Sequence, residues 1–408
     1  MNSAIPVFYF PERKPGGVQF LVIRICQELE RRGLSYLIFD HADGFIVNAL
    51  RQSGCDVRGH VDIKGITPEV ASSVVNDEMI LICFNGQECR FYDLFAGTGL
   101  HLLYWDVFEP DLWRTFILTN RSFFSFLNYL TSHSRRRFFS ALARKSSIAS
   151  VNEEGRRTIF RLAGLRTDSR CDVPILPVPI ESVPLSPSYS RATETNERRL
   201  IYIGRPLDWK VRPFERVVKD YSPLGCLFTV VTTDEQEFSK HLELSADLKE
   251  RVTYSTGIAG AGLEEYLVNS AYVVFAMGTS VLESARVGVP TVVMDYSSKE
   301  FPGDYRYRWF NDSEENDLGE NVENGRWVHG RTAEDILRSA GSEYRSIGRQ
   351  CRRKCSDLYA VEKVVDELLR MISESRFSMN DLSRYKLIGL VNWRRSTLPK
   401  LLNPGARV

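Results

Sequence analysis

Residues 272–295 constrain the fold of this chain more than any other part of the sequence. Residues 272–276 form a short run of β-branched, aromatic and other apolar side chains, which is typical of a buried strand. A Gly-Thr-Ser turn follows, and the next residues predict a short helix over 281–287 that Gly288 ends. Residues 291–294 then read as another apolar strand. This order of strand, turn, helix and strand predicts a parallel α/β sheet.

The turn before the predicted helix is a candidate anion site. Gly278 permits a sharp turn, and Thr279 or Ser280 suits a helix N-terminus, where unpaired N–H groups and the helix dipole attract anions. Glu283 would repel that anion, but its carboxylate can accept hydrogen bonds from sugar hydroxyls. A nucleoside diphosphate offers phosphates to the turn and a ribose diol to Glu283. The alternative is a capping box between Ser280 and Glu283 that binds no ligand.

Length and composition limit the classes of protein that the chain can be. Its 408 residues are too many for one ordinary core and suggest two or three domains. A formal net charge of +1 gives no electrostatic case for a nucleic-acid partner. The eight cysteines are scattered without a CxxC pair, so we predict reduced thiols and no metal or other cofactor. The sequence shows no signal peptide and no apolar run long enough to cross a bilayer, which predicts a cytoplasmic protein.

The N-terminal part alternates between strand and helix patterns. Residues 5–10 read as a buried strand, a loop with Gly16 and Gly17 follows, and residues 18–32 have helical apolar spacing. Residues 36–39 read as the next strand, which completes a βαβ unit with a right-handed crossover. The loop lacks the third glycine of a dinucleotide fingerprint, so Gly16 and Gly17 indicate a close backbone approach or simply a tight turn.

A linker divides the alternating pattern in two. Residues 184–199 are rich in Pro, Ser, Thr and charge, and the strand and helix alternation restarts after them. We therefore predict an N-terminal domain over 1–185, a second domain over 186–375, and a segment over 376–408 that packs back on the first domain. Residues 301–324 are acidic and aromatic, and are predicted to form a mobile loop.

The predicted fold class is α/β, with two Rossmann-like parallel-sheet domains facing across a cleft. Ligands of open parallel sheets bind beyond the carboxyl ends of the strands, and clefts between domains are favoured binding sites. The segment from Gly204 to Lys210 follows a predicted strand over 200–203, and the Gly278 turn follows another. Both are therefore expected to face the same cleft.

The ordered set of motifs resembles the GT-B glycosyltransferases that assemble bacterial polysaccharides and glycolipids (group 1-like). The similarity spans nearly the whole chain. The segments that carry it are Gly16-Gly17-Val18, Val151-Asn152-Glu153 to Gly164, Tyr202-Ile203-Gly204-Arg205 with Lys210, and Gly278-Thr279-Ser280…Glu283-Ser284-Ala285…Gly288-Val289-Pro290.

The resemblance implies a role for each matching position. Arg205 and Lys210, after Gly204, would neutralise the donor diphosphate and the leaving group, and Gly278, Thr279 and Ser280 would give it backbone N–H donors. Glu283 would hold the ribose hydroxyls, while Gly16 and Gly17 would approach the donor from the other domain. Two cations and a helix N-terminus can stabilise a departing nucleoside diphosphate without a metal. The alternative for Arg205 and Lys210 is a solvated pair in a loop.

Two departures from the resemblance leave the stereochemistry open. Retaining members usually carry two glutamates around the turn, and the earlier position is Phe275 here. The usual His-Asp after a middle strand of the first domain is Trp105-Asp106 here. We lean towards a retaining reaction, in which the leaving phosphate assists.

An inverting enzyme would instead need a general base near the acceptor hydroxyl. Asp106 and Glu109 are then the first candidates, followed by Asp40 and His41. The alternative for Asp106 is a helix or loop cap, and His41 also fits a polar residue at a strand end.

Two basic and apolar stretches, 135–145 and 386–402, suit peripheral contact with the inner membrane face, where a lipid-linked acceptor would lie. The alternatives are a solvated helix face for the first and packing on the N-terminal domain for the second.

The sequence therefore predicts a transferase that moves a sugar from a nucleoside-diphosphate sugar to a saccharide or lipid-linked acceptor in cell-surface polysaccharide biosynthesis. Two alternatives stay open. One is a nucleotide-sugar epimerase of the same architecture, and the other is a non-catalytic, glycosyltransferase-like protein.

Overall fold

The chain divides into two compact units in a computed structural model. The structure describes residues 4–11, 13, 16–57, 59–84, 92, 94–107, 125–165, 173–182, 198–297 and 299–384. The first unit combines Met1–Pro179 with Val361–Val408, and the second is Ile180–Ala360. The second predicted domain, 186–375, therefore extends past the structural division, because residues after Ala360 belong to the first unit.

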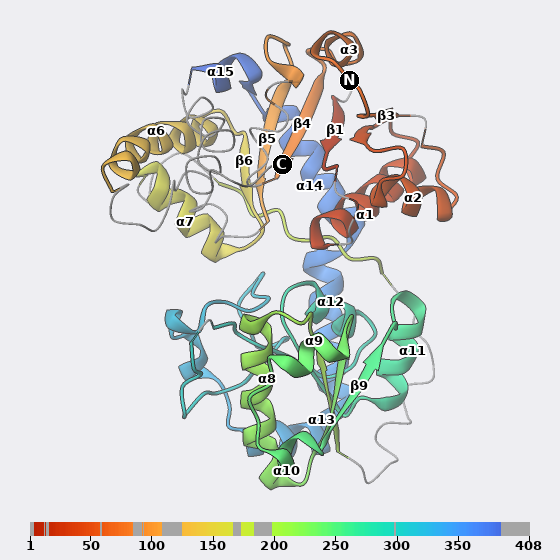
Figure 1. Ribbon diagram of the computed structural model, residues 1–408, viewed down its shortest axis with the longest axis vertical. Coiled ribbons are helices and arrows are strands. Elements are labelled where there is room, and N and C mark those ends of the chain that lie inside the picture. The colour runs from red at the N-terminus through yellow and green to blue at the C-terminus, as the bar shows by residue number, and fades with distance from the viewer. Residues whose placement is uncertain are drawn as a thin grey trace, which may run out of the picture. The chain divides into compact units, whose positions relative to one another are not determined.

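The first unit is built on a mostly parallel sheet, with helices around it (Figure 1). Its strands are β1 (Ile5–Tyr9), β2 (Leu37–Asp40), β3 (His60–Asp62), β4 (Met79–Phe84), β5 (His101–Asp106), β6 (Ile148–Ser150) and β13 (Phe377–Ser378). Its helices are α1 (Gly17–Arg31), α2 (Phe45–Gln52), α3 (Pro68–Val74), α6 (Ser125–Arg144), α7 (Glu153–Ala163), α14 (Val361–Glu374) and α15 (Met379–Ser383). The strand order is β13-β5-β4-β1-β2-β3, and β6 also pairs with β5.

The first βαβ unit forms as its periodicity predicts. The apolar stripe of α1 is buried, with Leu21, Val22, Ile25 and Leu29 at most 1% exposed. Gly33 then adopts a φ of 69°, a left-handed conformation that favours glycine and ends the helix. β1 pairs in parallel with β2 on one side and with β4 on the other.

Residues after Ala360 complete the first unit. Helix α14 packs against α1, and Arg32 of the first unit donates to the carbonyl of Glu362 at 2.7 Å. Strand β13 pairs antiparallel with β5, with Phe377 opposite Leu102. The described start of the predicted 376–408 segment thus lies on this sheet, and residues 385–408 lie outside the described residues.

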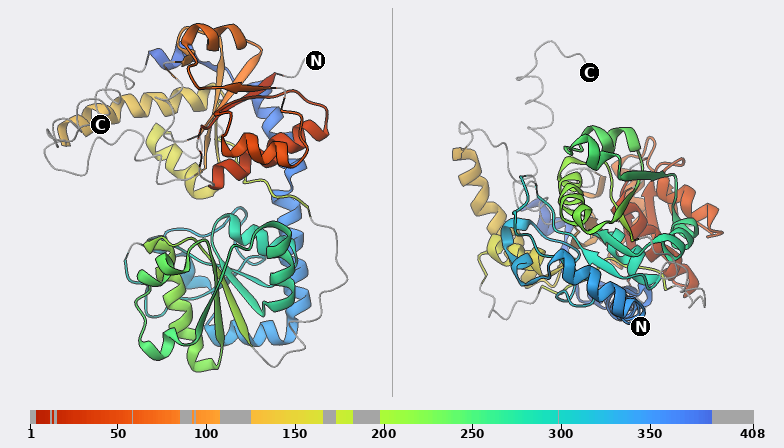
Figure 2. Two further views of the ribbon diagram at one scale, coloured as in Figure 1. Left: turned by 45° about the vertical axis from the view of Figure 1, so that its right-hand side comes forward. Right: turned by 90° about the horizontal axis from the view of Figure 1, so that it is seen from below.

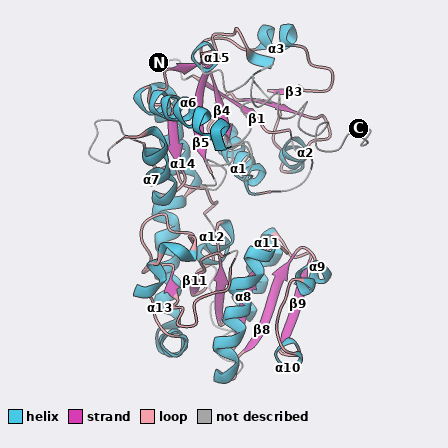
Figure 3. Ribbon diagram, turned by 60° about the vertical axis from the view of Figure 1, so that its left-hand side comes forward, coloured by secondary structure: helices cyan, strands magenta, loops and turns pink. Residues whose placement is uncertain are grey.

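The second unit is an α/β sheet with helices on both faces (Figure 2). Its strands are β7 (Arg199–Ile203), β8 (Leu227–Thr232), β9 (Val252–Thr256), β10 (Val273–Ala276), β11 (Thr291–Val293) and β12 (Arg308–Trp309). Its α-helices are α8 (Asp208–Tyr221), α9 (Glu235–Lys240), α10 (Ala246–Lys249), α11 (Gly260–Ser270), α12 (Thr279–Arg286) and α13 (Ala333–Tyr359). The order is β12-β11-β10-β7-β8-β9, parallel except for β12. Figure 3 shows β8 and β9 side by side in this sheet. The prediction of two Rossmann-like, parallel-sheet domains is confirmed.

The sheet of the second unit has a topological switch point between β7 and β10. The chain runs outward from β7 through β8 to β9, and then returns to β10 on the other side of β7. Strand pairing aligns Ile203, Ala276 and Val293 in one row near the carboxyl ends of β7, β10 and β11. Such a reversal leaves a crevice at the strand ends where α/β proteins bind ligands.

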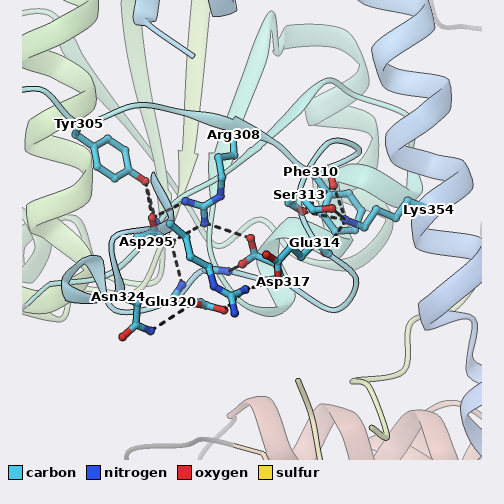
Figure 4. Close-up of polar contacts among 12 residues, drawn as sticks. Asp295, Tyr305, Arg308, Phe310, Ser313, Glu314, Asp317, Glu320, Asn324 and Lys354 are labelled. Atoms are coloured by element: carbon cyan, nitrogen blue, oxygen red, sulfur yellow. Dashed lines mark hydrogen bonds and ion pairs between the residues drawn. The ribbon is translucent and has the colours of Figure 1, made fainter. Parts of the chain in front are cut away.

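Residues 301–324, predicted as a mobile loop, are instead held by buried ionic contacts (Figure 4). Asp295, 2% exposed, accepts a bidentate pair of hydrogen bonds from Arg308 at 2.8 and 2.9 Å. The Tyr305 hydroxyl donates to the same carboxylate at 3.1 Å. Lys354 donates from α13 to the carbonyls of Phe310 at 2.9 Å and of Ser313 at 2.6 Å. These contacts tie the segment to the sheet and to α13.

The apolar half of the basic stretch 135–145 belongs to the core of the first unit. Phe138 and Phe139 are at most 1% exposed and pack on Tyr104, whereas Arg136 and Arg137 are exposed. The stretch therefore presents charge rather than aromatic rings to its surroundings. Among the described residues, no helix is both long and apolar enough to span a bilayer.

Candidate functional site

The loop after β7 carries two cations. Arg205 is exposed, and Lys210 is half-buried at the start of α8, with its Nζ 5.0 Å from the centre of the Trp209 ring. Burial and, secondarily, the nearby Arg205 charge lower the pKa of Lys210 to about 8. A bound anion would therefore stabilise the protonated, positively charged form of Lys210.

The turn after β10 opens α12 without a side-chain cap. The helix begins at Thr279, and Gly278 occupies the N-cap with a φ of 61° and a ψ of −140°. This backbone conformation favours glycine. The N-cap is Gly278 and has no side-chain cap, so the alternative of a capping box between Ser280 and Glu283 does not form. The first N–H groups of a helix have no partner within it, which leaves this turn suited to an anion.

The Glu283 carboxylate lies in an ionic cluster on the same helix. Its Oε2 is 2.7 Å from Nη2 of Arg286, and the same Nη2 is 2.7 Å from Oε1 of Glu264 on α11. The Glu283 side chain is still 20% exposed, whereas that of Arg286 is only 7% exposed. Glu283 was predicted from the sequence, whereas Arg286 was not. The helical i,i+3 spacing of Glu283 and Arg286 was the available signal.

An aromatic pair stands beside the cations. Trp209 and Tyr296 lie with ring centroids 5.6 Å apart and ring planes inclined at 72°. Trp209 follows β7 and Tyr296 follows β11, and these strands flank β10 about 10 Å apart. The ring pair thus joins residues that follow the two strands on either side of β10, the strand that leads into the Gly278 turn. Neither ring was predicted from the sequence as part of the site, because the contact between the two rings depends on the order of the strands.

In the first unit, Gly16 and Gly17 form the start of α1. Gly16 is the N-cap in an extended conformation, and no side chain caps this helix either. A Cβ on Gly16 would approach Oε1 of the buried Gln19 to 2.7 Å, so a larger residue would displace that side chain. The N-terminus of α1, at the predicted Gly16 and Gly17, is thus a second helix N-terminus that follows a strand, β1, and lacks a side-chain cap.

The two candidate bases at strand ends of the first unit are enclosed. Asp106 is fully buried and accepts a hydrogen bond from Ser150 at 3.2 Å, and a Cβ on Gly155 would lie 2.3 Å from its Oδ2. The side chain that caps α7 is that of Asn152, whose Oδ1 accepts from the N–H of Gly155 at 2.8 Å, and Asp106 lies against that first turn. Asp40 is also fully buried, and burial raises the pKa of its carboxyl.

The remaining predicted bases are less constrained. His41 is partly exposed beside Asp40, and its backbone N–H donates to that carboxylate at 2.8 Å. Glu109 lies outside the described residues. Within the part of the chain that the structure describes, no three His, Cys, Asp or Glu side chains are grouped to hold a metal ion.

The predicted donor-binding residues of the second unit thus follow neighbouring strands, whereas Gly16 and Gly17 belong to the first unit. Gly204 and Arg205 follow β7, the Gly278-Thr279-Ser280 turn follows β10, and the two strands are neighbours. The two units, each a Rossmann-like sheet with a glycine-bearing strand end, define the GT-B fold of glycosyltransferases.

Comparisons with solved structures identify the same fold. A glycosyltransferase from Rickettsia africae matches with a TM-score of 0.59 and 12% identity over 92% of this chain and 99% of its own. Anabaena Alr3699/HepE, solved with UDP and glucose, matches with a TM-score of 0.57 and 14% identity over 90% and 99%. The pneumococcal O-GlcNAc transferase GtfA, solved with UDP and GlcNAc, matches with a TM-score of 0.52 and 9% identity over 91% and 99%. No family model and no curated protein matches the sequence.

Proposed function

We propose that the chain is a glycosyltransferase that moves a sugar, of the hexosyl or a related type, from a nucleoside-diphosphate sugar to a saccharide or lipid-linked acceptor. We assign it to cell-surface polysaccharide biosynthesis. The GT-B fold supports the reaction class, and the structural neighbours that were solved with UDP and a sugar support the donor class. The alternatives of an epimerase and of a non-catalytic protein are separated by the experiment below.

The observation that carries the proposal is the switch point of the second unit. Arg205 and Lys210 come from one side of it, and the uncapped N-terminus of α12 comes from the other. A leaving diphosphate develops negative charge as the glycosidic bond breaks, and fixed cations and N–H dipoles stabilise that charge. Lys210, whose pKa is about 8 before any ligand binds, would gain most from a dianionic partner.

We favour a retaining, metal-independent reaction. The burial of Asp106 and Asp40 supports this choice, because an enclosed carboxylate cannot reach an acceptor hydroxyl without a rearrangement. The phosphate of the leaving group would then take the proton from the acceptor. The cations would carry the charge that a metal ion carries in other transferases.

We also propose that the first unit contacts the inner membrane face. The exposed side chains of Arg136, Arg137 and Arg144 on α6 would be attracted to anionic lipid headgroups. Co-sedimentation with vesicles that contain anionic lipid should fall when the three arginines are changed to glutamine. Equal binding to neutral vesicles would contradict the proposal.

The main test measures both nucleotide binding and turnover of the nucleotide sugar. Calorimetric titration with UDP and GDP should show binding of at least one of them, and the matching nucleotide sugar should release nucleoside diphosphate slowly when no acceptor is present. Formation of an epimer instead of the free nucleotide would identify an epimerase. Absence of binding to either nucleotide would identify a non-catalytic protein.

A further inference from the structure

Arg286 occupies an unusual position at the end of the donor-site helix. Its side chain is 7% exposed and lies among three carboxylates. Nη2 is 2.7 Å from both Glu283 and Glu264, and Nη1 is 3.9 Å from Oε2 of Glu181. The backbone carbonyl of Glu181 also accepts a hydrogen bond from Nη1 at 3.5 Å. The guanidinium thus joins α11, α12 and the segment before β7 within the second unit.

The contacts of Arg286 reduce an electrostatic repulsion at the N-terminus of α12. Glu283 lies within the first two turns of a helix whose N-terminus faces the proposed diphosphate, so its negative charge opposes phosphate binding. The guanidinium of Arg286 is one helical turn further on and offsets that charge at 2.7 Å. Because the ion pair is largely removed from solvent, salt and water screen it less than an exposed pair.

Arg286 also fixes the direction of the Glu283 carboxylate. A free glutamate on a helix surface samples several rotamers, and ordering it costs conformational entropy. The guanidinium is planar, and it is also held by Glu264 at the same Nη2 and by the Glu181 carbonyl at Nη1, so it offers one geometry to Glu283. A carboxylate held in this way is pre-organised as an acceptor for hydroxyl groups.

From this arrangement we infer that Arg286 is a positioning residue for the donor. It orients Glu283 towards the ribose hydroxyls and offsets part of its charge, so that one helix N-terminus accommodates both a carboxylate and a diphosphate. The inference rests on the proposed function and adds a residue on which recognition of the ribose depends. If Arg286 were merely structural, it would join α11 to α12 without affecting discrimination between ribose and deoxyribose.

The test compares ribonucleotide with deoxyribonucleotide binding. Calorimetry on the full chain gives the dissociation constants of UDP and 2′-deoxy-UDP, or of GDP and 2′-deoxy-GDP if only GDP binds. A hydrogen bond to a charged group is expected to favour the ribonucleotide about 10-fold or more in the wild type. Arg286→Met should reduce that ratio to within about 2-fold, as Glu283→Gln does, and Arg286→Lys should give an intermediate ratio.

A second readout uses the charge. In the wild type, Glu283→Gln should weaken UDP binding because a neutral amide oxygen replaces a charged acceptor and binds the ribose hydroxyls less strongly. In the Arg286→Met background the same change should strengthen UDP binding, because it removes a carboxylate that has lost its pairing with Arg286. Arg338→Met provides the matched control, since Arg338 forms an exposed i,i+3 pair with Asp335 at 2.9 Å and should change neither readout.

The outcomes separate the two proposals. If the wild type binds neither nucleotide, the proposed function fails and the inference fails with it. If the wild type prefers the ribonucleotide and Arg286→Met keeps that preference while its melting temperature falls, Arg286 is only structural and the inference alone is overturned. Should Arg286→Met fail to fold, an unchanged preference in Arg286→Lys overturns it equally.

Discussion

The surroundings of Lys210 lower the pKa of its ammonium group. Its backbone carbonyl accepts a hydrogen bond from the Tyr202 hydroxyl at 2.5 Å, which anchors the start of α8 below the side chain. Trp209 lies under the ammonium, and Arg205 adds a second positive charge nearby. An ammonium that is partly removed from water beside another cation loses its proton more readily than usual.

We expect nucleotide affinity to depend on pH through Lys210. In the free protein its ammonium is charged below a pKa of about 8 and neutral above it. Affinity for UDP should therefore be full below pH 8 and fall as the pH rises, by up to ~10-fold between pH 7 and pH 9 if the bound lysine stays charged. Titration calorimetry across this range measures the slope. Lys210→Arg should flatten it, because a guanidinium keeps its charge; an equal slope in this variant would assign the effect to another group.

Arg205→Ala should weaken donor binding without weakening the fold. The side chain is exposed, so its removal leaves no cavity and should move the melting temperature by little. Loss of a charged hydrogen bond to phosphate should raise the dissociation constant of UDP by about 10- to 100-fold. Calorimetry and thermal unfolding measure the two effects separately. An unchanged dissociation constant would remove Arg205 from the site.

At the scale of elements, the turn between β10 and α12 depends on backbone geometry alone. Gly278 has a φ of 61°, and a Cβ added to it would have no neighbour within 4 Å. Its amide donates to the carbonyl of Leu318 at 2.6 Å, which holds the turn against the segment that returns over the strand ends. The conformation, rather than crowding, is what favours glycine here.

Gly278→Ala should therefore act through strain. Forcing a side chain into this conformation should lower the free energy of unfolding by about 1–3 kcal/mol, and should also weaken UDP binding because the first N–H groups of α12 move. Gly262→Ala in α11 is the matched control, since alanine should stabilise a helical position by about 0.5–1 kcal/mol. Urea denaturation compares the two. Equal stability of both variants would contradict the strain argument.

The Asp295–Arg308 pair should matter more than any exposed ion pair of the second unit. Arg308→Met leaves the Asp295 carboxylate buried without its bidentate partner, which should cost about 3–5 kcal/mol of unfolding free energy. Arg331→Met, which breaks an exposed pair with Asp312, should cost no more than about 1 kcal/mol. Denaturant unfolding gives both values. Limited proteolysis within 301–324 should accelerate only in Arg308→Met.

At the scale of the whole molecule, the second unit is an insertion into the first. The chain leaves the first unit at Pro179 and returns to it at Val361. The two crossings lie together, because Ile180 forms a parallel bridge with Ala360 and its N–H donates to the Tyr359 carbonyl at 2.7 Å. The second unit is thus contiguous in sequence, whereas the first needs two separate segments.

This organisation predicts unequal effects of truncation. Residues 180–360 expressed alone should unfold cooperatively and keep most of the UDP affinity, since they carry Arg205, Lys210 and α12. Residues 1–360 should contain a destabilised first unit, because α14 supplies the buried side chains of Val364, Leu368 and Ile372. Calorimetric unfolding resolves the units. Two intact transitions in the 1–360 protein would contradict the prediction.

The fold was predictable from the sequence because its signals are local. Residues 272–295 alone show a strand, a helix stop at Gly288 and another strand, and each observed element lies within a few residues of its predicted range. The positions of Arg205 and the Gly278 turn followed from strand ends. The Trp209–Tyr296 contact could not be predicted, because it needs the strand order, and the burial of Asp106 could not, because it depends on the packing of α7.

The inserted arrangement has a consequence for synthesis on the ribosome. At ~5–20 residues per second, residues 180–360 take roughly 10–40 s to make. Throughout that interval α1 lacks α14, and β5 lacks its β13 partner at His101 and Leu102 although β6 pairs with the rest of the strand, so the first unit waits mainly with an uncovered apolar surface. The half that leaves the ribosome first is therefore the last to be completed, and it is the half that a chaperone would have to protect.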